Sequence, residues 1–263
     1  MTTNQINDKN TEGNTFNDNI LSFNINSNEY FKNRPRYPSE LYKSIFDNCS
    51  EFNIAWDCGC GNGQVSIDLV SKFNKIEASD INENQLLNSY KHDKIHYTIQ
   101  NAESPDFPED YFDLICTAQC LHWFNLDVFF RHSKRMLKNN GVFACWGYGF
   151  FHINDKIDEL INKLLLTEID PFWASQNRIV QNRYENVEFP FIRIKTPKIE
   201  MNIEWNYKQL LDYLNTWSAV KLYNDKFHTD IIDEIKPIII KTMRDTEIVK
   251  MDFSCYLGKN DKK

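Results

Sequence analysis

Residues 56–64 read WDCGCGNGQ, in which an aspartate is followed by three glycines at every second position. The residues before this stretch, from Asn53, are apolar and strand-like. The residues after it, QVSIDLVSKF (64–73), space their apolar side chains as a helix does. The stretch therefore predicts a strand that passes through a glycine turn into a helix. Such a turn either lets a ligand approach the backbone closely or merely makes a tight connection.

The alternation of strand and helix continues to about residue 150. Further strands are predicted at KIEASDI (75–81), IHYTIQNAE (95–103), YFDLICTAQ (111–119) and VFACWGYG (142–149), with helices expected at 82–91 and 126–141. The strand at 111–119 is almost continuously apolar, as expected of a strand covered on both faces. This order predicts an α/β fold with a doubly wound, mostly parallel sheet.

The rest of the chain differs from this pattern at both ends. Residues 1–27 are rich in Asn and Thr and poor in apolar residues, so we expect a disordered, Asn-rich tail. After residue 150 most segments have helical character. We interpret residues 28–263 as a single domain, with a cofactor-binding half at about 50–150. A helical elaboration at about 151–250 would cover the ligand side of the sheet.

Composition excludes several classes of protein. The formal net charge is -7 and no long run of Lys or Arg occurs, so a nucleic-acid partner is not expected. No apolar run is long enough to span a membrane, and no secretory signal is visible. The seven cysteines are odd in number, which indicates free thiols in a reducing, cytoplasmic setting. Cys58 and Cys60 lack a second ligand pair at suitable spacing, so no metal site is expected.

Polar residues follow three consecutive predicted strands, at the sheet edge where open parallel sheets bind ligands. The glycine turn ends the first strand, Asp80 ends the second, and Ala102 and Glu103 end the third. A carboxylate at Asp80 can accept both hydroxyls of a ribose, although it could also cap a helix. Glu103 alone could be a surface charge. Their occurrence together at consecutive strand ends predicts a site for an adenosine-containing ligand.

The glycine spacing distinguishes between adenosine ligands. A dinucleotide fingerprint needs a third glycine where this chain has Gln64, and the Gly-Lys-Ser/Thr ending of a phosphate-binding loop is absent. What remains, Asp57 with Gly59, Gly61 and Gly63, resembles the signature of class I S-adenosylmethionine-dependent methyltransferases. The resemblance implies that these four residues, together with Asp80, Ala102 and Glu103, bind S-adenosylmethionine. It also implies a seven-stranded, Rossmann-like methyltransferase sheet.

Other segments resemble one subgroup of that family. FKNRPRYPSELY (31–42), AQCLHWF (118–124), CWGYG (145–149) and LNTWSA (214–219) are similar to segments of methyltransferases that resemble trans-aconitate methyltransferase. The resemblance covers the chain from about residue 28 to its end. It is specific for the cofactor class and fairly specific for the subgroup, but it does not specify the acceptor.

Candidate residues for the chemistry lie outside the glycine turn. His122 is the one obvious candidate for a general base, although it could equally be a structural histidine. Gln119 and Trp123 either shape the pocket or pack in the core. The segment around Arg34 and the segment 173–184 could fold back together as a lid, whose arginines would clamp a carboxylate. The candidate substrate residues are Arg34, Tyr37, Arg178, Arg183 and Trp217.

The sequence thus predicts a methyltransferase that uses S-adenosylmethionine on a small molecule, with O-methylation of a carboxylic acid as the favoured reaction. A non-catalytic S-adenosylmethionine-binding or scaffold protein is one alternative. A nicotinamide-dependent dehydrogenase is another, which Gln64 disfavours. No nucleic acid, membrane or metal is expected at the site, and the sequence leaves the oligomeric state open.

Overall fold

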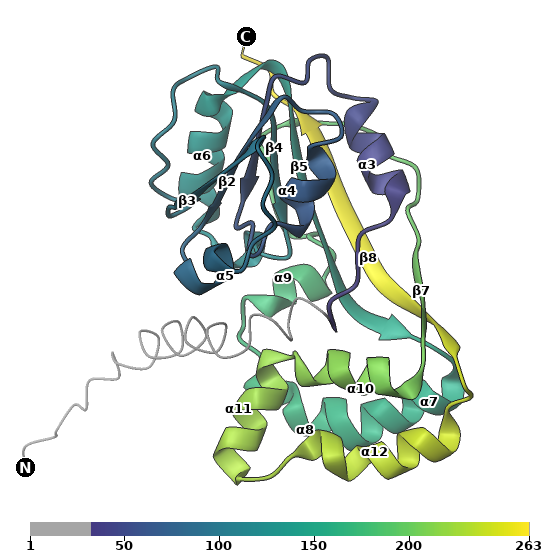
Figure 1. The fold of residues 1–263 in the computed structure, drawn as a ribbon. Coiled ribbons are helices and arrows are strands. Elements are labelled where there is room, and N and C mark those ends of the chain that lie inside the picture. The colour runs from purple at the N-terminus through teal and green to yellow at the C-terminus, as the bar shows by residue number, and fades with distance from the viewer. Residues whose placement is uncertain (1–32, 263) are drawn as a thin grey trace, which may run out of the picture.

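The computed structural model of the chain describes residues 33–262. The predicted tail at 1–27 lies outside the described residues. Within the described part, a sheet flanked by helices stands above a separate layer of helices (Figure 1). Two long strands connect these layers and carry the chain from one to the other.

The sheet begins with five parallel strands. These are β1 (Ile54–Cys58), β2 (Lys75–Asp80), β3 (Ile95–Ile99), β4 (Phe112–Ala118) and β5 (Leu137–His152), arranged in the order β3-β2-β1-β4-β5. The strand order reverses between β1 and β4, so the carboxyl ends of these two strands flank the crevice where such sheets bind ligands. The predicted doubly wound, mostly parallel fold is confirmed.

The remaining strands are antiparallel and gather on β8 (Glu247–Lys259), which pairs with β5. At one end β8 also pairs with β6 (Ile192–Arg193), and at the other with β7 (Met201–Trp205). The described sheet therefore has eight strands rather than the seven expected. The difference arises because β8 is long enough to take two short partners at separate places.

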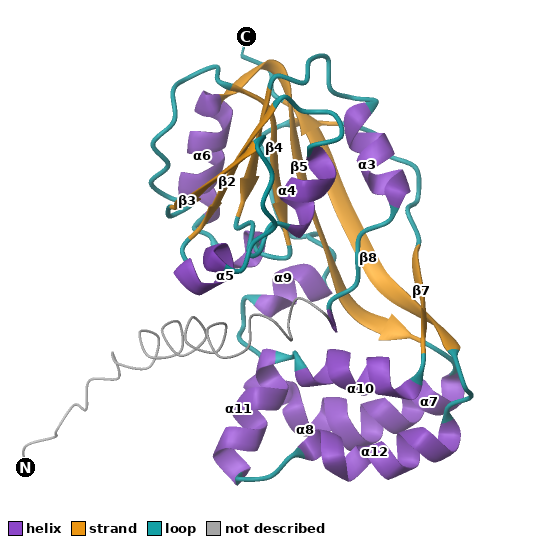
Figure 2. Cartoon of the chain, in the orientation of Figure 1, coloured by secondary structure: helices purple, strands orange, loops and turns teal. Residues whose placement is uncertain are grey.

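Helices cover both faces of the sheet (Figure 2). On one face lie α3 (Ser39–Phe46), α4 (Gln64–Leu69) and α5 (Glu83–Leu87), and on the other lies α6 (Leu126–Met136). In β4, Leu114 and Cys116 pack in the cluster beneath α3 and α4, whereas Ile115 packs in the cluster beneath α6. The continuous apolar run of this strand is thus explained by burial on both faces.

The helical layer has a hydrophobic cluster of its own. It is built from α7 (Asp155–Ile161), a π-helical turn (Asn162–Leu166), α8 (Thr167–Ile169), a 3-10 turn (Asp170–Phe172), α10 (Tyr207–Asn215), α11 (Ser218–Phe227) and α12 (Ile231–Thr242). Tyr148 of β5 and Met251 of β8 belong to the same cluster. The two long strands therefore attach this layer to the sheet.

The short helix α9 (Asn177–Gln181) lies between the sheet and the helical layer (Figure 1) and contacts β5. This contact is close. A Cβ at Gly147 of β5 would lie 2.6 Å from the Tyr184 hydroxyl and 3.2 Å from a methyl group of Val180. Glycine at position 147 thus lets the α9 segment approach the end of the parallel strands.

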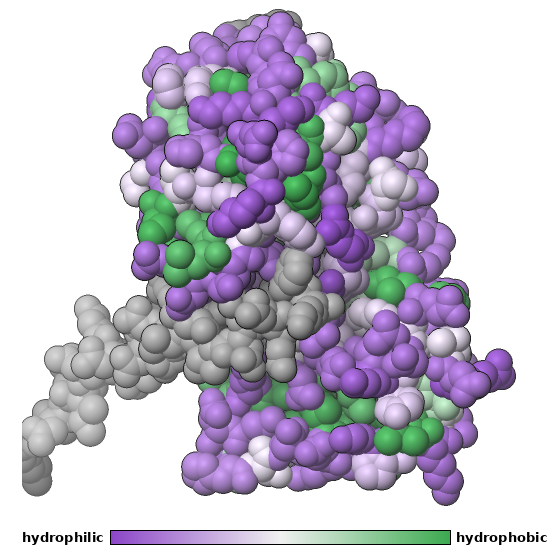
Figure 3. All heavy atoms as spheres, in the orientation of Figure 1, coloured by the Kyte–Doolittle hydropathy of each residue, from purple (hydrophilic) through white to green (hydrophobic). Residues whose placement is uncertain are grey.

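The surface on the face drawn in Figure 3 is mainly hydrophilic, and its hydrophobic residues gather near α5 and along the helical layer. Leu87 and Ile99 are among the exposed apolar side chains. Across residues 33–262, no helix combines the length and apolar character needed to cross a membrane. All seven cysteines lie in this part of the chain and none is in a disulfide.

Candidate functional site

The glycine turn follows β1 and has positive φ at all three of its glycines, Gly59, Gly61 and Gly63. A Cβ at Gly59 would lie 2.4 Å from the Cys120 sulfur, and one at Gly63 would lie 2.1 Å from the Tyr97 hydroxyl. A Cβ at Gly61 would come no closer than 4.0 Å to any atom of the described residues with which it could clash. Two of the glycines are therefore required by packing within the protein. The third leaves open space against the backbone.

Asp80 ties the end of β2 to this turn. Its Oδ2 accepts a hydrogen bond from the Gly61 backbone N–H (2.8 Å), and its Oδ1 accepts one from the Asn82 N–H (2.9 Å). Burial raises the pKa of this carboxyl above its usual range, opposed by the hydrogen bonds from the backbone. Asp80 thus supports the start of the next helix and also faces the site. Each carboxylate oxygen keeps a second lone pair that a ligand hydroxyl can use.

Asp57, one residue from the end of β1, is 1% exposed. The Ser66 hydroxyl of α4 donates a 2.6 Å hydrogen bond to its Oδ2. Burial raises the pKa of Asp57 to about 7, against the lowering effect of the bond from Ser66. This carboxyl therefore links the strand before the turn to the helix after it.

Ala102 and Glu103 lie after β3. Ala102 is buried. Glu103 Oε1 accepts a hydrogen bond from the Asn125 N–H (2.8 Å), and the Glu103 N–H donates to Asn101 Oδ1 (2.8 Å). Asn125 is the N-cap of α6, so Glu103 connects the end of β3 to the start of that helix.

These strand ends surround a cavity of about 380 Å³, called here the large cavity. Of the seven predicted cofactor residues, Asp57, Gly59, Gly61, Asp80, Ala102 and Glu103 line it, and Gly63 does not. The structure brings further side chains to the same walls that the sequence did not single out, namely Asn62, Gln85, Gln100, Cys120 and Phe124. Asn62 lies inside the glycine turn, and Cys120 and Phe124 lie in the segment AQCLHWF (118–124), whereas Gln85 and Gln100 follow no motif spacing.

A second cavity of about 90 Å³, the small cavity, lies between α9, the end of β5 and the helical layer. Arg34, Gln119, Trp123 and Tyr148 line both cavities, so the two adjoin. The segment 118–124 therefore stands at the junction. Gln119 holds its place there with φ at 58°, and its Nε2 donates a 3.1 Å hydrogen bond to the Tyr148 carbonyl oxygen.

His122 lines the small cavity and is 6% exposed. Burial lowers its pKa to about 3, so the imidazole is neutral near neutral pH. Within residues 33–262, its Nδ1 meets no hydrogen-bond partner. A histidine with so low a pKa is a weak proton acceptor, so this environment does not favour its use as a general base. Its neighbour Trp123 lies with its ring 4.9 Å from the imidazole, centroid to centroid.

The three predicted arginines lie in different places. Arg34 lines both cavities; its Nη2 donates to the Thr216 carbonyl oxygen at 3.5 Å. Arg178 is exposed and forms an ion pair with Asp170 (2.8 Å), and Arg183 forms one with Asp252 (2.7 Å). Neither Arg178 nor Arg183 lines either cavity. The structure brings only Arg34 to the candidate site, because the other two arginines meet carboxylates at the surface.

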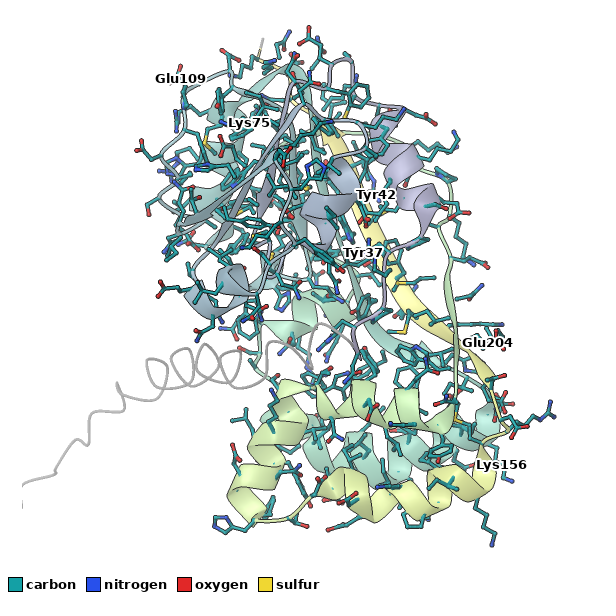
Figure 4. The ribbon with its side chains drawn as sticks, in the orientation of Figure 1. Tyr37, Tyr42, Lys75, Glu109, Lys156 and Glu204 are labelled. Atoms are coloured by element: carbon teal, nitrogen blue, oxygen red, sulfur yellow. The ribbon has the colours of Figure 1, made fainter. Side chains whose placement is uncertain are left out.

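The two aromatic residues predicted to bind substrate, Tyr37 and Trp217, lie at different ends of the candidate site. Tyr37 lines the large cavity, and Figure 4 shows it on the segment that leads toward α3. Its ring stands nearly perpendicular to that of Trp146, with centroids 5.6 Å apart. Trp217 is 3% exposed, lines the small cavity and packs 5.5 Å from the Trp173 ring. Among residues 33–262, no three His, Cys, Asp or Glu side chains are grouped so that they could hold a metal ion.

Most of the similar proteins carry methyltransferase names, and one is named as an arginine-hydroxylase. Residues 56–145 match the model of a methyltransferase domain. A Dictyostelium discoideum protein that carries a methyltransferase name is 29% identical over 239 residues, covering 88% of this chain and 91% of that protein. The mitochondrial arginine-hydroxylase NDUFAF5 of Rattus norvegicus is 27% identical over 223 residues. This match covers 73% of this chain and 63% of the length of NDUFAF5.

A solved methyltransferase structure has a similar fold. A protein of Anaeromyxobacter dehalogenans, described as a Type II methyltransferase, superposes with a TM-score of 0.79 at 29% identity. The superposition covers 88% of this chain and 99% of that one. The likeness therefore extends over most of this chain and nearly all of that one.

Proposed function

Because this chain is a class I S-adenosylmethionine-dependent methyltransferase, we propose that it holds the cofactor in the large cavity and a small-molecule acceptor in the small one. The observation that carries this proposal is that the two cavities adjoin and share four lining residues. Methyl transfer is an in-line displacement, so donor and acceptor need neighbouring compartments with an open junction.

The residues of the large cavity fit S-adenosylmethionine. Gly61 leaves open space against the backbone for a ligand to lie on. Asp80 can accept the two hydroxyls of a ribose, and the walls at Ala102 and Glu103 would surround the adenine. When bound, the cofactor supplies an electrophilic methyl group on a sulfonium centre. The role of the protein is then to bring an acceptor atom to about 3–3.5 Å from that carbon along the axis of displacement.

O-methylation of a carboxylic acid is the reaction we favour. Arg34 is the one charged side chain among the described residues that line the small cavity, and no carboxylate lies there to hold an amine. A carboxylate acceptor is already ionised near neutral pH, so it needs no general base. The low basicity of His122 is compatible with such an acceptor. The resemblance to the trans-aconitate methyltransferase subgroup agrees with this choice.

Calorimetry and a transfer assay test the proposal separately. We expect S-adenosylmethionine and S-adenosylhomocysteine to bind and NADH not to bind. Methyl transfer should then be measured with labelled cofactor on a panel of carboxylic acids, phenols and amines. The panel should include free arginine, because one similar protein, NDUFAF5, is named as an arginine-hydroxylase. Binding of NADH alone would indicate a dehydrogenase. Binding of S-adenosylmethionine without methyl transfer to any member of the panel would indicate a non-catalytic binding protein.

The cellular compartment and the kind of partner are part of the same proposal. Seven free thiols favour a reducing compartment, and we propose the cytoplasm. We also propose a small molecule rather than nucleic acid as the partner, because the chain carries a net charge of -7.

A further inference from the structure

Residues 34–37, called here the strap, separate the large cavity from a groove on the protein surface. Arg34 and Tyr37 line the large cavity. Tyr37 also lines an open groove of about 850 Å³ between α3 and α4, and Arg36 lines that groove but not the large cavity. Because one side chain of the strap borders both spaces, the strap is the wall between them. Movement of the strap would therefore join the large cavity to the groove.

The inner side chains of the strap attach it to the sheet and to the helical layer. Figure 1 shows this segment leading from the region between the two layers to α3. The Tyr37 ring lies 5.6 Å from that of Trp146 and 6.2 Å from that of Tyr148, centroid to centroid. The Arg34 guanidinium lies 5.3 Å from the centre of the Tyr213 ring. Substitution of Arg34 or Tyr37 would alter the large cavity itself, so neither residue can test movement of the strap alone.

Arg36 attaches the outer side of the strap to the cofactor half of the protein. Its guanidinium forms an ion pair with Asp68 of α4 and donates a 3.3 Å hydrogen bond to the Tyr90 hydroxyl. The Tyr90 backbone N–H in turn donates to the Asn62 carbonyl oxygen in the glycine turn (3.1 Å). Neither Asp68 nor Tyr90 lines the large cavity. The contacts of Arg36 with these two residues, called here the latch, thus hold the strap without contributing to the cavity wall.

Two prolines restrict the backbone of the strap. Pro35 lies within it, and Pro38 follows it as the N-cap of α3, with φ at -66° and ψ at 145°. Proline fixes its own φ and confines the residue before it to extended conformations, so Arg34 and Tyr37 have little backbone freedom. Release of Arg36 should therefore shift the strap as a unit rather than loosen one side chain.

We propose that Arg36 is a positioning residue that keeps the strap closed over the large cavity, through Asp68 and Tyr90, and thereby limits the rate of cofactor exchange. The inference rests on the proposed function for the identity of the ligand. Because the latch lies outside the cavity, it closes the free and the bound protein alike. The cofactor must then wait for the strap to open both when it enters and when it leaves. Loss of the latch should raise the association and dissociation rates together and leave Kd nearly unchanged, whereas loss of a direct contact acts mainly on dissociation.

Stopped-flow fluorescence of the full-length chain measures both rates. Trp123 lines the large cavity, so its fluorescence should change when a ligand binds there. S-adenosylhomocysteine is the probe, because its ammonium and carboxylate charges cancel and the loss of a surface cation does not alter its electrostatic steering. In Arg36→Ala, both rates should rise about three- to tenfold, as expected for exposed ion-pair and cation–π contacts, with Kd by calorimetry within about twofold of the wild-type value.

Further variants test whether Arg36 acts through its ion pair. Asp68→Ala should accelerate exchange as Arg36→Ala does, and the double variant should be little faster than either, because both substitutions break one contact. Arg36→Lys keeps the charge and should recover part of the wild-type rates. Lys43→Ala is the matched control, since Lys43 lines the same groove but pairs with Asp47 at the end of α3 (2.5 Å). Both rates should be unchanged in this control.

Modification of Cys60 tests the strap without any cofactor. Cys60 lines the large cavity and is buried. Its modification by methyl methanethiosulfonate, followed by mass spectrometry, should be faster in Arg36→Ala and in Asp68→Ala than in the wild type or in Lys43→Ala. This comparison detects opening of the strap even where the open state is a minor one.

The outcomes distinguish this inference from the proposed function. If Arg36→Ala raises only the dissociation rate or neither rate, or if Lys43→Ala has the same effect, the strap does not limit exchange and the inference is overturned, although the cofactor still binds. If S-adenosylhomocysteine does not bind at all, the proposed function is overturned. The rate of Cys60 modification then decides the role of the strap, and equal rates in all four proteins would show that Arg36 does not keep it closed.

Discussion

A substitution at Asp80 can distinguish a role in ligand binding from a purely structural role. Its carboxylate accepts two backbone hydrogen bonds, from Gly61 at 2.8 Å and from Asn82 at 2.9 Å, and we propose that it also accepts the ribose hydroxyls of the cofactor. Asp80→Asn keeps the shape but leaves one oxygen, so one backbone N–H faces an amide nitrogen. Hydrogen bonds to a charged group contribute about 1.5–3 kcal/mol. We therefore expect S-adenosylhomocysteine affinity to fall by roughly 10- to 150-fold.

Calorimetry on the folded variant measures this loss, and urea unfolding measures the structural cost in parallel. Asp93→Asn is the matched control, because Asp93 is exposed and does not line the large cavity. Its affinity should equal that of the wild type. If Asp80→Asn lowers the free energy of unfolding but changes affinity less than about twofold, the reasoning is refuted. Asp80 would then serve only to connect the turn to α5.

Three further results are expected. The pKa of Asp57 is raised to about 7, against about 3.9 in an unfolded chain, so the folded state retains this proton as pH rises and loses stability between about pH 4 and 7. The wild-type free energy of unfolding in urea, relative to Asp57→Asn, should therefore fall by up to about 1.4 kcal/mol per pH unit in that window; a constant difference would contradict the raised pKa. Once a carboxylic acid substrate is found, Arg34→Ala should lower kcat/KM by at least about tenfold. In Arg178→Ala and Arg183→Ala, kcat/KM should stay within about twofold of the wild-type value. Equal losses in all three variants would refute the assignment of Arg34 to the acceptor site. The ring-proton signal of His122, identified by its loss in His122→Asn, should not titrate between pH 5 and 8, because its pKa is about 3; a midpoint near 6.5 would show that the imidazole is exposed to water.

The cofactor side of the site was accessible from the sequence because its residues follow strand ends. Asp80 stands at the end of a strand with a clear apolar pattern, and the carboxyl ends of parallel strands meet at one edge of a sheet. The fold pattern alone was therefore enough to bring Asp57, Asp80 and Glu103 to one cavity. No knowledge of side-chain packing was needed for that step.

The acceptor side was not accessible in the same way. Whether Arg178 and Arg183 reach the site depends on how α9 docks against β5, and on Asp170 and Asp252 lying within reach of them. These are contacts between segments that no local spacing relates.

The long strand β5 has a consequence for how the molecule opens. Val142 and Ala144 pack beneath α3 and α4, Phe143 packs beneath α6, and Tyr148 packs in the helical layer, so a single strand belongs to all three hydrophobic clusters. Opening the helical layer far enough to release β5 would expose apolar surface on both faces of the sheet. Both halves of the site should therefore unfold as one cooperative unit, with the amides of β5 exchanging with solvent only when the whole domain unfolds.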